Sequence, residues 1–216
     1  MLLKKNNLLI KKLFICSIYF ITTPFLAQPY ANSTDSLLAE YSKNLTLHKH
    51  FTADFTQYRY ISMFKKPLIS TGTISFSYPD KILFHYKTPL EAVILLNNNK
   101  MKRYRIEKGK HVEQPSMEMV SKPIIRNIMH FFKGDFIKSS SFNVKINKDK
   151  PRTFTLTPAN SESKHFFSSI EFSFSENLQY IEEIKLIEQS EDYILVKHEQ
   201  PSFKAVPDSI FNIQNK

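Results

Sequence analysis

The stretch of residues 51–96 constrains the fold most, because apolar and polar residues alternate along it in four short runs. In the first run Phe51, Ala53 and Phe55 fall on one side of an extended chain, and the residues between them are polar. A period of two is typical of an antiparallel strand with one buried face. Breaks that contain Pro67, Pro79 and Pro89 separate the runs. The stretch therefore predicts a meander of four strands with one apolar face.

The same alternation continues along the rest of the chain, in residues 100–114 and again from residue 142 onward. The content of 19 Phe and 10 Tyr, with only 3 Gly, also favours sheet over helix. We therefore expect roughly ten or eleven short antiparallel strands with few helices to cover them. The expected fold is mainly β with α, a curved sheet or open (incomplete) antiparallel β-barrel whose concave face the helices cover only in part.

Two helices are predicted. Residues 34–48 follow a run of N-capping residues and carry apolar side chains at helical spacing. A second helix is expected from Pro123 to the residue before Gly134, because Pro suits a first helical turn and Gly suits a helix end. Its apolar residues cover more than half of its circumference, so it is either an ordinary core helix or a movable lid. The lid candidates are Ile124, Ile125, Ile128, Met129 and Phe132.

The first 33 residues are typical of a secretory signal peptide, with lysines followed by a short apolar segment and then by small residues. Cleavage is expected after Ser33, with Ala27 and Ala31 as alternative sites. Residues 34–216 are then one exported domain without cysteine, because Cys16 lies in the signal. Its formal charge of about +6 suits an anionic membrane surface or an acidic partner, or serves only to keep the domain in solution.

The sequence contains no motif that indicates catalysis, a metal or a cofactor. The three glycines are too scattered to cradle a phosphate, and no nucleophile stands in a known catalytic spacing. His48 and His50 are two residues apart without an acidic neighbour, which indicates a surface position rather than a metal pair. We therefore expect a protein that is not an enzyme, although folding could still assemble a dispersed catalytic site.

The apolar strand faces predict a cavity for an apolar ligand, with ordinary packing of the same aromatics as the alternative. The candidate lining residues are Phe55, Ile74, Phe76, Phe84, Tyr86, Phe142, Phe154 and Phe172. A basic hairpin at residues 100–114 carries Arg103 and Arg105. Its cations either protect a sheet edge from further strand addition or dock an acidic partner.

The order of several short motifs resembles the LolA-like outer-membrane lipoprotein carrier proteins, in a divergent branch of that family. The motifs span nearly the whole exported part: Phe55-Thr56-Gln57, Pro67-Leu68 before Gly72, Tyr78-Pro79, Pro89, Ile124-Ile125 before Phe132-Lys133-Gly134-Asp135, and Leu156-Thr157-Pro158. The resemblance implies an open β-barrel of about eleven antiparallel strands with a helical lid. It also implies a periplasmic carrier that shields the acyl chains of its cargo.

One position departs from the family pattern. The resemblance implies an arginine immediately before Pro79 that latches the lid, and this chain has Tyr78 there. A phenol hydroxyl makes fewer hydrogen bonds than a guanidinium group, so the latch is expected to be weaker or different.

The favoured hypothesis is a monomeric periplasmic carrier that moves a lipoprotein or other lipidated cargo from the inner to the outer membrane. Its implied partners are that cargo, an inner-membrane exporter as donor and an outer-membrane acceptor, and no nucleic acid. The sequence leaves open whether the cargo is a lipoprotein, a glycolipid or another lipid. The alternatives are an envelope interaction protein that docks a partner through its sheet edge and basic hairpin, and a hydrolase with a dispersed site.

Overall fold

The computed structural model describes residues 33–98, 100–115, 129, 132–134, 142–159, 164–165 and 167–213. The expected signal peptide lies outside the described residues except for Ser33, and so do the lid candidates Ile124, Ile125 and Ile128. In the part of the chain that is described, no helix is both long enough and apolar enough to cross a membrane.

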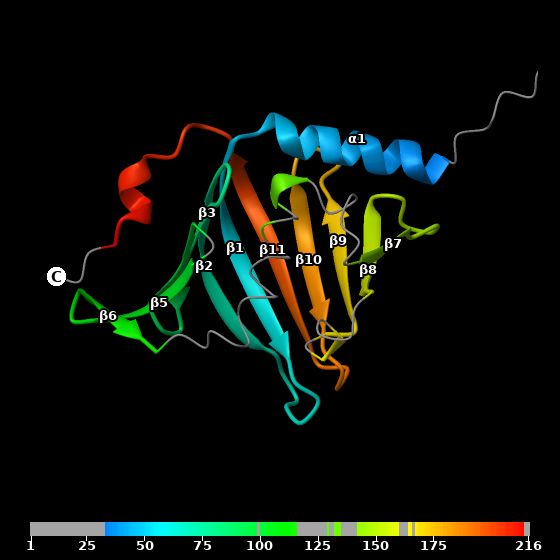
Figure 1. Cartoon of the computed structure of the whole chain (residues 1–216). Coiled ribbons are helices and arrows are strands. Elements are labelled where there is room, and N and C mark those ends of the chain that lie inside the picture. Colours follow the sequence, from blue (N-terminus) through cyan, green and yellow to red (C-terminus); the bar gives the residue numbers. More distant parts are fainter. Residues whose placement is uncertain are drawn as a thin grey trace, which may run out of the picture. The chain divides into compact units, whose positions relative to one another are not determined.

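The described strands form one antiparallel sheet of eleven strands (Figure 1). Their bounds are β1 (His50–Tyr60), β2 (Leu68–Ser77), β3 (Lys81–Thr88), β4 (Ala92–Asn97), β5 (Lys100–Glu107), β6 (Lys110–Gln114), β7 (Phe142–Ile146), β8 (Thr153–Pro158), β9 (Ser169–Phe174), β10 (Ile181–Ile187) and β11 (Tyr193–Ser202).

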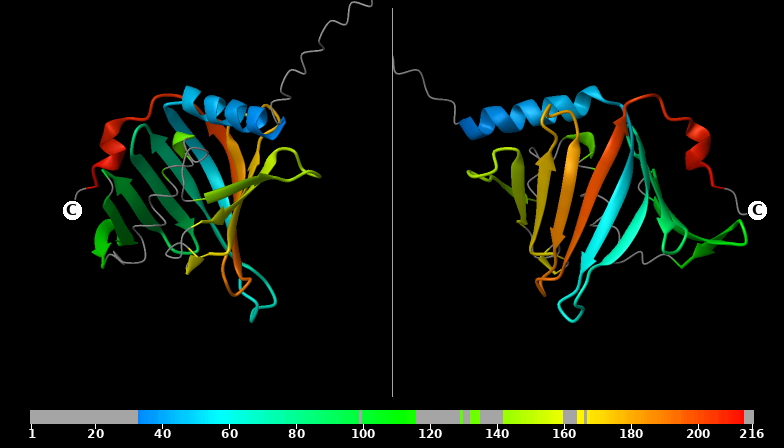
Figure 2. Two further views of the ribbon diagram at one scale, coloured as in Figure 1. Left: turned by 45° about the vertical axis from the view of Figure 1, so that its right-hand side comes forward. Right: turned by 180° about the vertical axis from the view of Figure 1, so that it is seen from behind.

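The sheet consists of two meanders joined through their first and last strands, in the order β6-β5-β4-β3-β2-β1-β11-β10-β9-β8-β7. The strands β6 and β7 are its edges, so the sheet curves without closing (Figure 2). The prediction of an open antiparallel barrel with mainly β structure is confirmed. The predicted breaks at Pro79 and Pro89 also fall between strands, and both peptide bonds before these prolines are cis.

One long helix, α1 (Ser33–Leu47), lies across one end of the strands, close to the predicted residues 34–48 (Figures 1 and 2). It buries Leu38, Tyr41 and Leu45 against the sheet. The short 3-10 helix η2 (Asp208–Phe211) follows β11 and packs on the other face of the sheet, where Phe211 and Val206 cover Leu95.

The concave face of the sheet carries two hydrophobic clusters. The α1 cluster joins the helix to β7–β10, and its buried members are Leu38, Tyr41, Leu45, Phe142, Phe154, Leu156, Phe167, Ile170, Phe172, Phe174 and Ile181. The β1–β5 cluster has as buried members Phe51, Ala53, Phe55, Ile74, Phe76, Ile82, Leu96, Met129 and Phe132. Half-buried Phe84, Tyr86, Ile94, Met101, Tyr180, Val196 and Phe203 pack against it.

Candidate functional site

The register of β1 to β5 aligns apolar side chains in rows that cross the sheet. One row runs from Ala53 through Ile74, Phe84 and Ile94 to Arg103, each residue opposite the next on the neighbouring strand. A second row joins Phe55, Gly72, Tyr86, Ala92 and Arg105. Because side chains alternate between the two faces of a strand, both rows lie on the concave face. Alternation in the sequence thus becomes one continuous apolar surface on β1 to β4, with arginines next to it on β5.

Gly72 makes room for the aromatic ring of Phe55. A Cβ atom at Gly72 would lie 2.8 Å from Cζ of Phe55 and would also collide with the backbone carbonyl oxygen of His85. The ring of Phe55 meets that of Tyr86 edge to face, with 5.1 Å between the ring centroids. Two aromatic side chains therefore pack over a position that has no side chain.

Tyr86 gives this apolar surface a polar boundary. Its hydroxyl donates a hydrogen bond to Oε1 of Gln57 at 3.0 Å. Burial raises the pKa of the Tyr86 phenol, and the positive charge of Arg103 opposes that shift. The phenol is therefore neutral at physiological pH and acts as a hydrogen-bonding group near a guanidinium ion.

Met129 and Phe132 cover the β1–β5 cluster from the predicted lid segment. Phe132 stacks on Phe76 with 5.5 Å between the ring centroids and also contacts Phe51. Gly134 follows with a positive φ of 71°, as expected for a glycine just past a helix end. Its carbonyl oxygen accepts a hydrogen bond from the hydroxyl of Ser42 on α1, which ties the segment to the helix.

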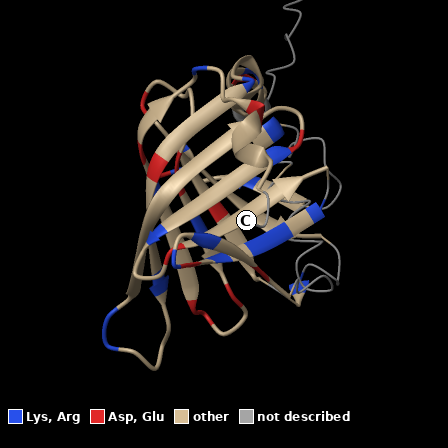
Figure 3. Cartoon of the chain, turned by 90° about the vertical axis from the view of Figure 1, so that its left-hand side faces the viewer, with Lys and Arg blue, Asp and Glu red and all other residues tan. Residues whose placement is uncertain are grey.

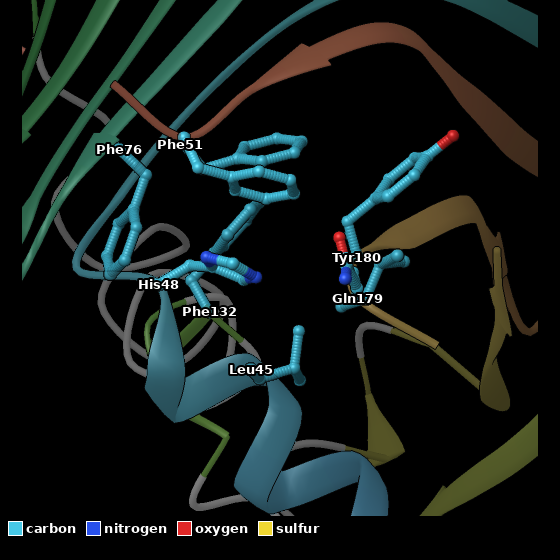
Figure 4. A pocket seen from close by; sticks show the side chains of 9 residues that line it. Leu45, His48, Phe51, Phe76, Phe132, Gln179 and Tyr180 are labelled. Atoms are coloured by element: carbon cyan, nitrogen blue, oxygen red, sulfur yellow. The ribbon is translucent and has the colours of Figure 1, made fainter. Parts of the chain in front are cut away.

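A narrow apolar cavity lies where this segment meets α1 and the turn before β10 (Figure 4). Its lining residues are Leu45, His48, Phe51, Phe76, Phe132, Gln179, Tyr180, Ile181 and Phe203. The space is about 340 Å³ including its open side, but it is so narrow that it has room for only about one water molecule. An acyl chain therefore needs Phe132 or its neighbours to move before it can enter here.

The eight predicted lining residues divide between the two clusters. Phe55, Ile74, Phe76, Phe84 and Tyr86 come together in the β1–β5 cluster. Phe142, Phe154 and Phe172 lie in the α1 cluster instead and are at most 6% exposed. There the ring of Tyr41 packs between those of Phe154 and Phe174, at 4.6 and 4.5 Å between centroids. That part of the concave face is filled by the protein's own helix.

The other singled-out residues lie at the margins of the sheet. Tyr78 is 55% exposed between β2 and β3, and its hydroxyl has no hydrogen-bond partner among the described residues. Its role as a latch stays a prediction. Arg103 and Arg105 belong to the hairpin β5–β6 at the sheet edge, as expected, but they share the face of the apolar rows.

Sequence reasoning missed His198, whose side chain is buried within the sheet. Its Nδ1 donates to the carbonyl oxygen of Ile181 at 2.9 Å, while Nε2 has no partner in the described residues. Burial lowers the pKa of this imidazole, so it stays neutral. His48 stacks on Phe203 at 3.8 Å between centroids. No group of three or more His, Cys, Asp or Glu residues in the described ranges could hold a metal ion.

The family is shown by sequence. The profile of the outer membrane lipoprotein carrier protein LolA matches residues 47–214, which include all eleven strands of the described sheet. The chain belongs to the LolA family. This is a family of carrier proteins rather than enzymes, and its members bind lipoproteins or other lipid cargo. A search of the curated proteins found no significant match.

Solved structures that resemble this chain are distant from it in sequence. A DUF1329 family protein from Desulfovibrio piger aligns with a TM-score of 0.50 and 7% identity, over 83% of this chain and 97% of that one. A LolA superfamily protein from Nitrosomonas europaea aligns with a TM-score of 0.45 and 8% identity, over 83% and 97%. A putative outer membrane lipoprotein-sorting protein domain from Vibrio parahaemolyticus gives 0.44 and 8%, over 81% and 94%.

Proposed function

We propose that this LolA-family chain is a periplasmic carrier that shields the acyl chains of a lipidated cargo on its β1–β5 cluster. It takes the cargo from an inner-membrane exporter and delivers it to an outer-membrane acceptor, as a monomer. The N-terminal signal peptide would direct it to the periplasm. This carrier role is the specific form of the lipid-binding role that family membership indicates.

One observation carries the proposal. The half-buried side chains of Phe84, Tyr86, Ile94 and Met101 continue a buried apolar cluster, and among the described residues Met129 and Phe132 cover that cluster from the lid segment. Each methylene group removed from water contributes about 0.8 kcal/mol, so shielding one long acyl chain is worth on the order of 10 kcal/mol. Adaptable aromatic and thioether contacts give such binding without fixing the cargo too rigidly for release.

The test is lipid binding by the natively purified protein. Mass spectrometry of an organic extract should detect co-purified acyl lipid, and an environment-sensitive fluorescent fatty acid should bind saturably. Phe84→Ser should weaken that binding about tenfold, because the exchange removes apolar surface from the proposed site.

Leu83→Ser is the matched control, since Leu83 is half-buried on the opposite face of the same strand and packs against the C-terminal segment. Its binding should be unchanged. If the protein carries no acyl lipid and does not bind the fluorescent fatty acid, the carrier role is wrong.

A further inference from the structure

The hairpin β5–β6 places cations beside the apolar surface rather than away from it. Tyr104 is only 1% exposed on the convex side of β5, so its neighbours Arg103 and Arg105 project from the concave side. Arg103 lies opposite Ile94, which lies opposite Phe84. Figure 3 marks lysines and arginines in blue along the ribbon, and several of them lie on the strands beside the C-terminus.

Arg103 is available to a ligand. It is exposed and makes no hydrogen bond or ion pair with the described residues, although its charge acts on Tyr86. Arg105 is paired with Glu107 on its own strand, at 3.4 Å, with both side chains more than half exposed. An exposed pair of this kind contributes little, so a ligand anion can compete for Arg105.

The two rows reach these arginines on β5, one strand before the edge strand β6, and this gives the surface a direction. From β1 to β5 each row crosses four strand spacings, which is about 19 Å, with apolar side chains first and a guanidinium group last. An acyl chain lying along a row would place its polar end beside Arg103 and Arg105. The guanidinium fork matches the oxygens of a phosphate or carboxylate group.

We propose that Arg103 and Arg105 form a subsite for an anionic headgroup, so that the cargo is an acyl lipid whose headgroup carries a phosphate or a carboxylate. The inference rests on the proposed acyl site and adds the chemical class of the ligand. The charge of Arg103 acts on the Tyr86 phenol, although the Tyr86 hydroxyl itself is bonded to Gln57 on β1. In this proposal the hairpin β5–β6, which the sequence suggested as a docking edge for a partner, is part of the lipid site.

Displacement of the fluorescent fatty acid from the full protein tests this assignment. The competitors are palmitate, lysophosphatidic acid with a palmitoyl chain, and neutral monopalmitoyl glycerol, all below their micelle concentrations and at low salt. We expect at least one anionic competitor to bind ten times or more tightly than the neutral one, because charge-assisted hydrogen bonds are the stronger kind. The rank of palmitate against lysophosphatidic acid then identifies the favoured anion.

The double variant Arg103→Gln with Arg105→Gln should abolish that preference and leave binding of monopalmitoyl glycerol unchanged. Lys102→Gln is the matched control, since Lys102 lies on the opposite face of β5 and pairs with Glu113 at 3.3 Å. Equal binding of all three lipids, or a preference that survives in the double variant, overturns the headgroup subsite and leaves the carrier role standing. If the fluorescent fatty acid does not bind and no lipid co-purifies, both proposals are overturned.

Discussion

The two clusters on the concave face contain the same kinds of residue but are covered differently. In the α1 cluster, Phe154 and Leu156 are fully buried under a helix that contributes Leu38, Tyr41 and Leu45. In the β1–β5 cluster, Phe84 and Ile94 remain half-buried. One half of the face is thus packed under the protein's own helix α1, and we propose that the other half has apolar surface left for a guest. A carrier needs both, because a domain without disulfides must keep a stable core while it opens elsewhere.

The largest expected effect is on the core half. Phe154→Ala should lower the free energy of unfolding by about 3–5 kcal/mol, because it leaves a cavity beneath Tyr41. Phe84→Ala should cost only about 1–2 kcal/mol, because Phe84 is half-buried. Urea unfolding followed by circular dichroism measures both. Equal losses would contradict the division into a core half and a binding half.

A second substitution probes the tight packing inside the β1–β5 cluster. Gly72→Ala should destabilise the protein by about 1–3 kcal/mol and displace Phe55, because the added methyl group meets the ring of Phe55 and the backbone of β3. Acyl-probe affinity should change with it. Ser70→Ala, two residues earlier on the same strand face, is the control and should be nearly neutral. Thermal unfolding together with probe titration separates the two effects.

The buried His198, which lies between the two clusters, should make the stability of the folded protein depend on pH. Its pKa is lowered by burial in the folded state, so the unfolded chain binds the proton more readily below the usual value of 6.5. The contribution of neutral His198 to the free energy of unfolding is therefore fully present above that value. It decreases as the pH falls toward the folded-state pKa. Between pH 7.5 and 5.5 this group should lower the free energy of unfolding by about 1 kcal/mol.

His198→Asn checks this contribution, because the asparagine amide can still donate to the Ile181 carbonyl near the position of Nδ1. Its free energy of unfolding should fall less over the same pH range than that of the unsubstituted protein. Parallel pH profiles for the two proteins would show that His198 is not the group responsible.

The smallest effect concerns the bond that joins the two halves. Ser42→Ala removes the hydrogen bond from α1 to the carbonyl oxygen of Gly134 and should cost about 1 kcal/mol of stability. Because this bond holds the segment that carries Phe132, the rate of acyl-probe uptake in stopped-flow fluorescence should rise several-fold. Lys43→Ala, at an exposed position of the same helix, is the control. If the rate of probe uptake is unchanged, the bond between Ser42 and Gly134 does not restrain lid movement.

Much of the fold could be predicted because alternation reports strand faces directly. The period of two in residues 51–96 placed Phe55, Ile74 and Phe84 on one face, and the register confirms that they share it. The open antiparallel sheet and the helix near residues 34–48 were predicted for the same reason, that local patterning and the final packing agree.

The division of the site could not be predicted, because it depends on which part of the face α1 covers. Phe154 and Phe84 have the same alternating context in the sequence, but Tyr41 of α1 packs on Phe154, which lies in the α1 cluster, whereas Phe84 lies in the β1–β5 cluster. Nor does the sequence reveal that Arg103 shares a face with Ile94, since this follows from the register of the β4–β5 hairpin. The buried His198 gave no local signal, because its partner carbonyl lies 17 residues away at Ile181.

Photo-crosslinking with a diazirine-bearing palmitate tests most directly whether the two halves differ in function. We expect saturable labelling of β3 to β5, on or next to Phe84, Ile94 and Met101, with unlabelled palmitate as competitor. The peptides of β8 and β9 that contain Phe154 and Phe172 should remain unlabelled. Labelling confined to those β8 and β9 peptides, or no saturable labelling at all, would contradict the account.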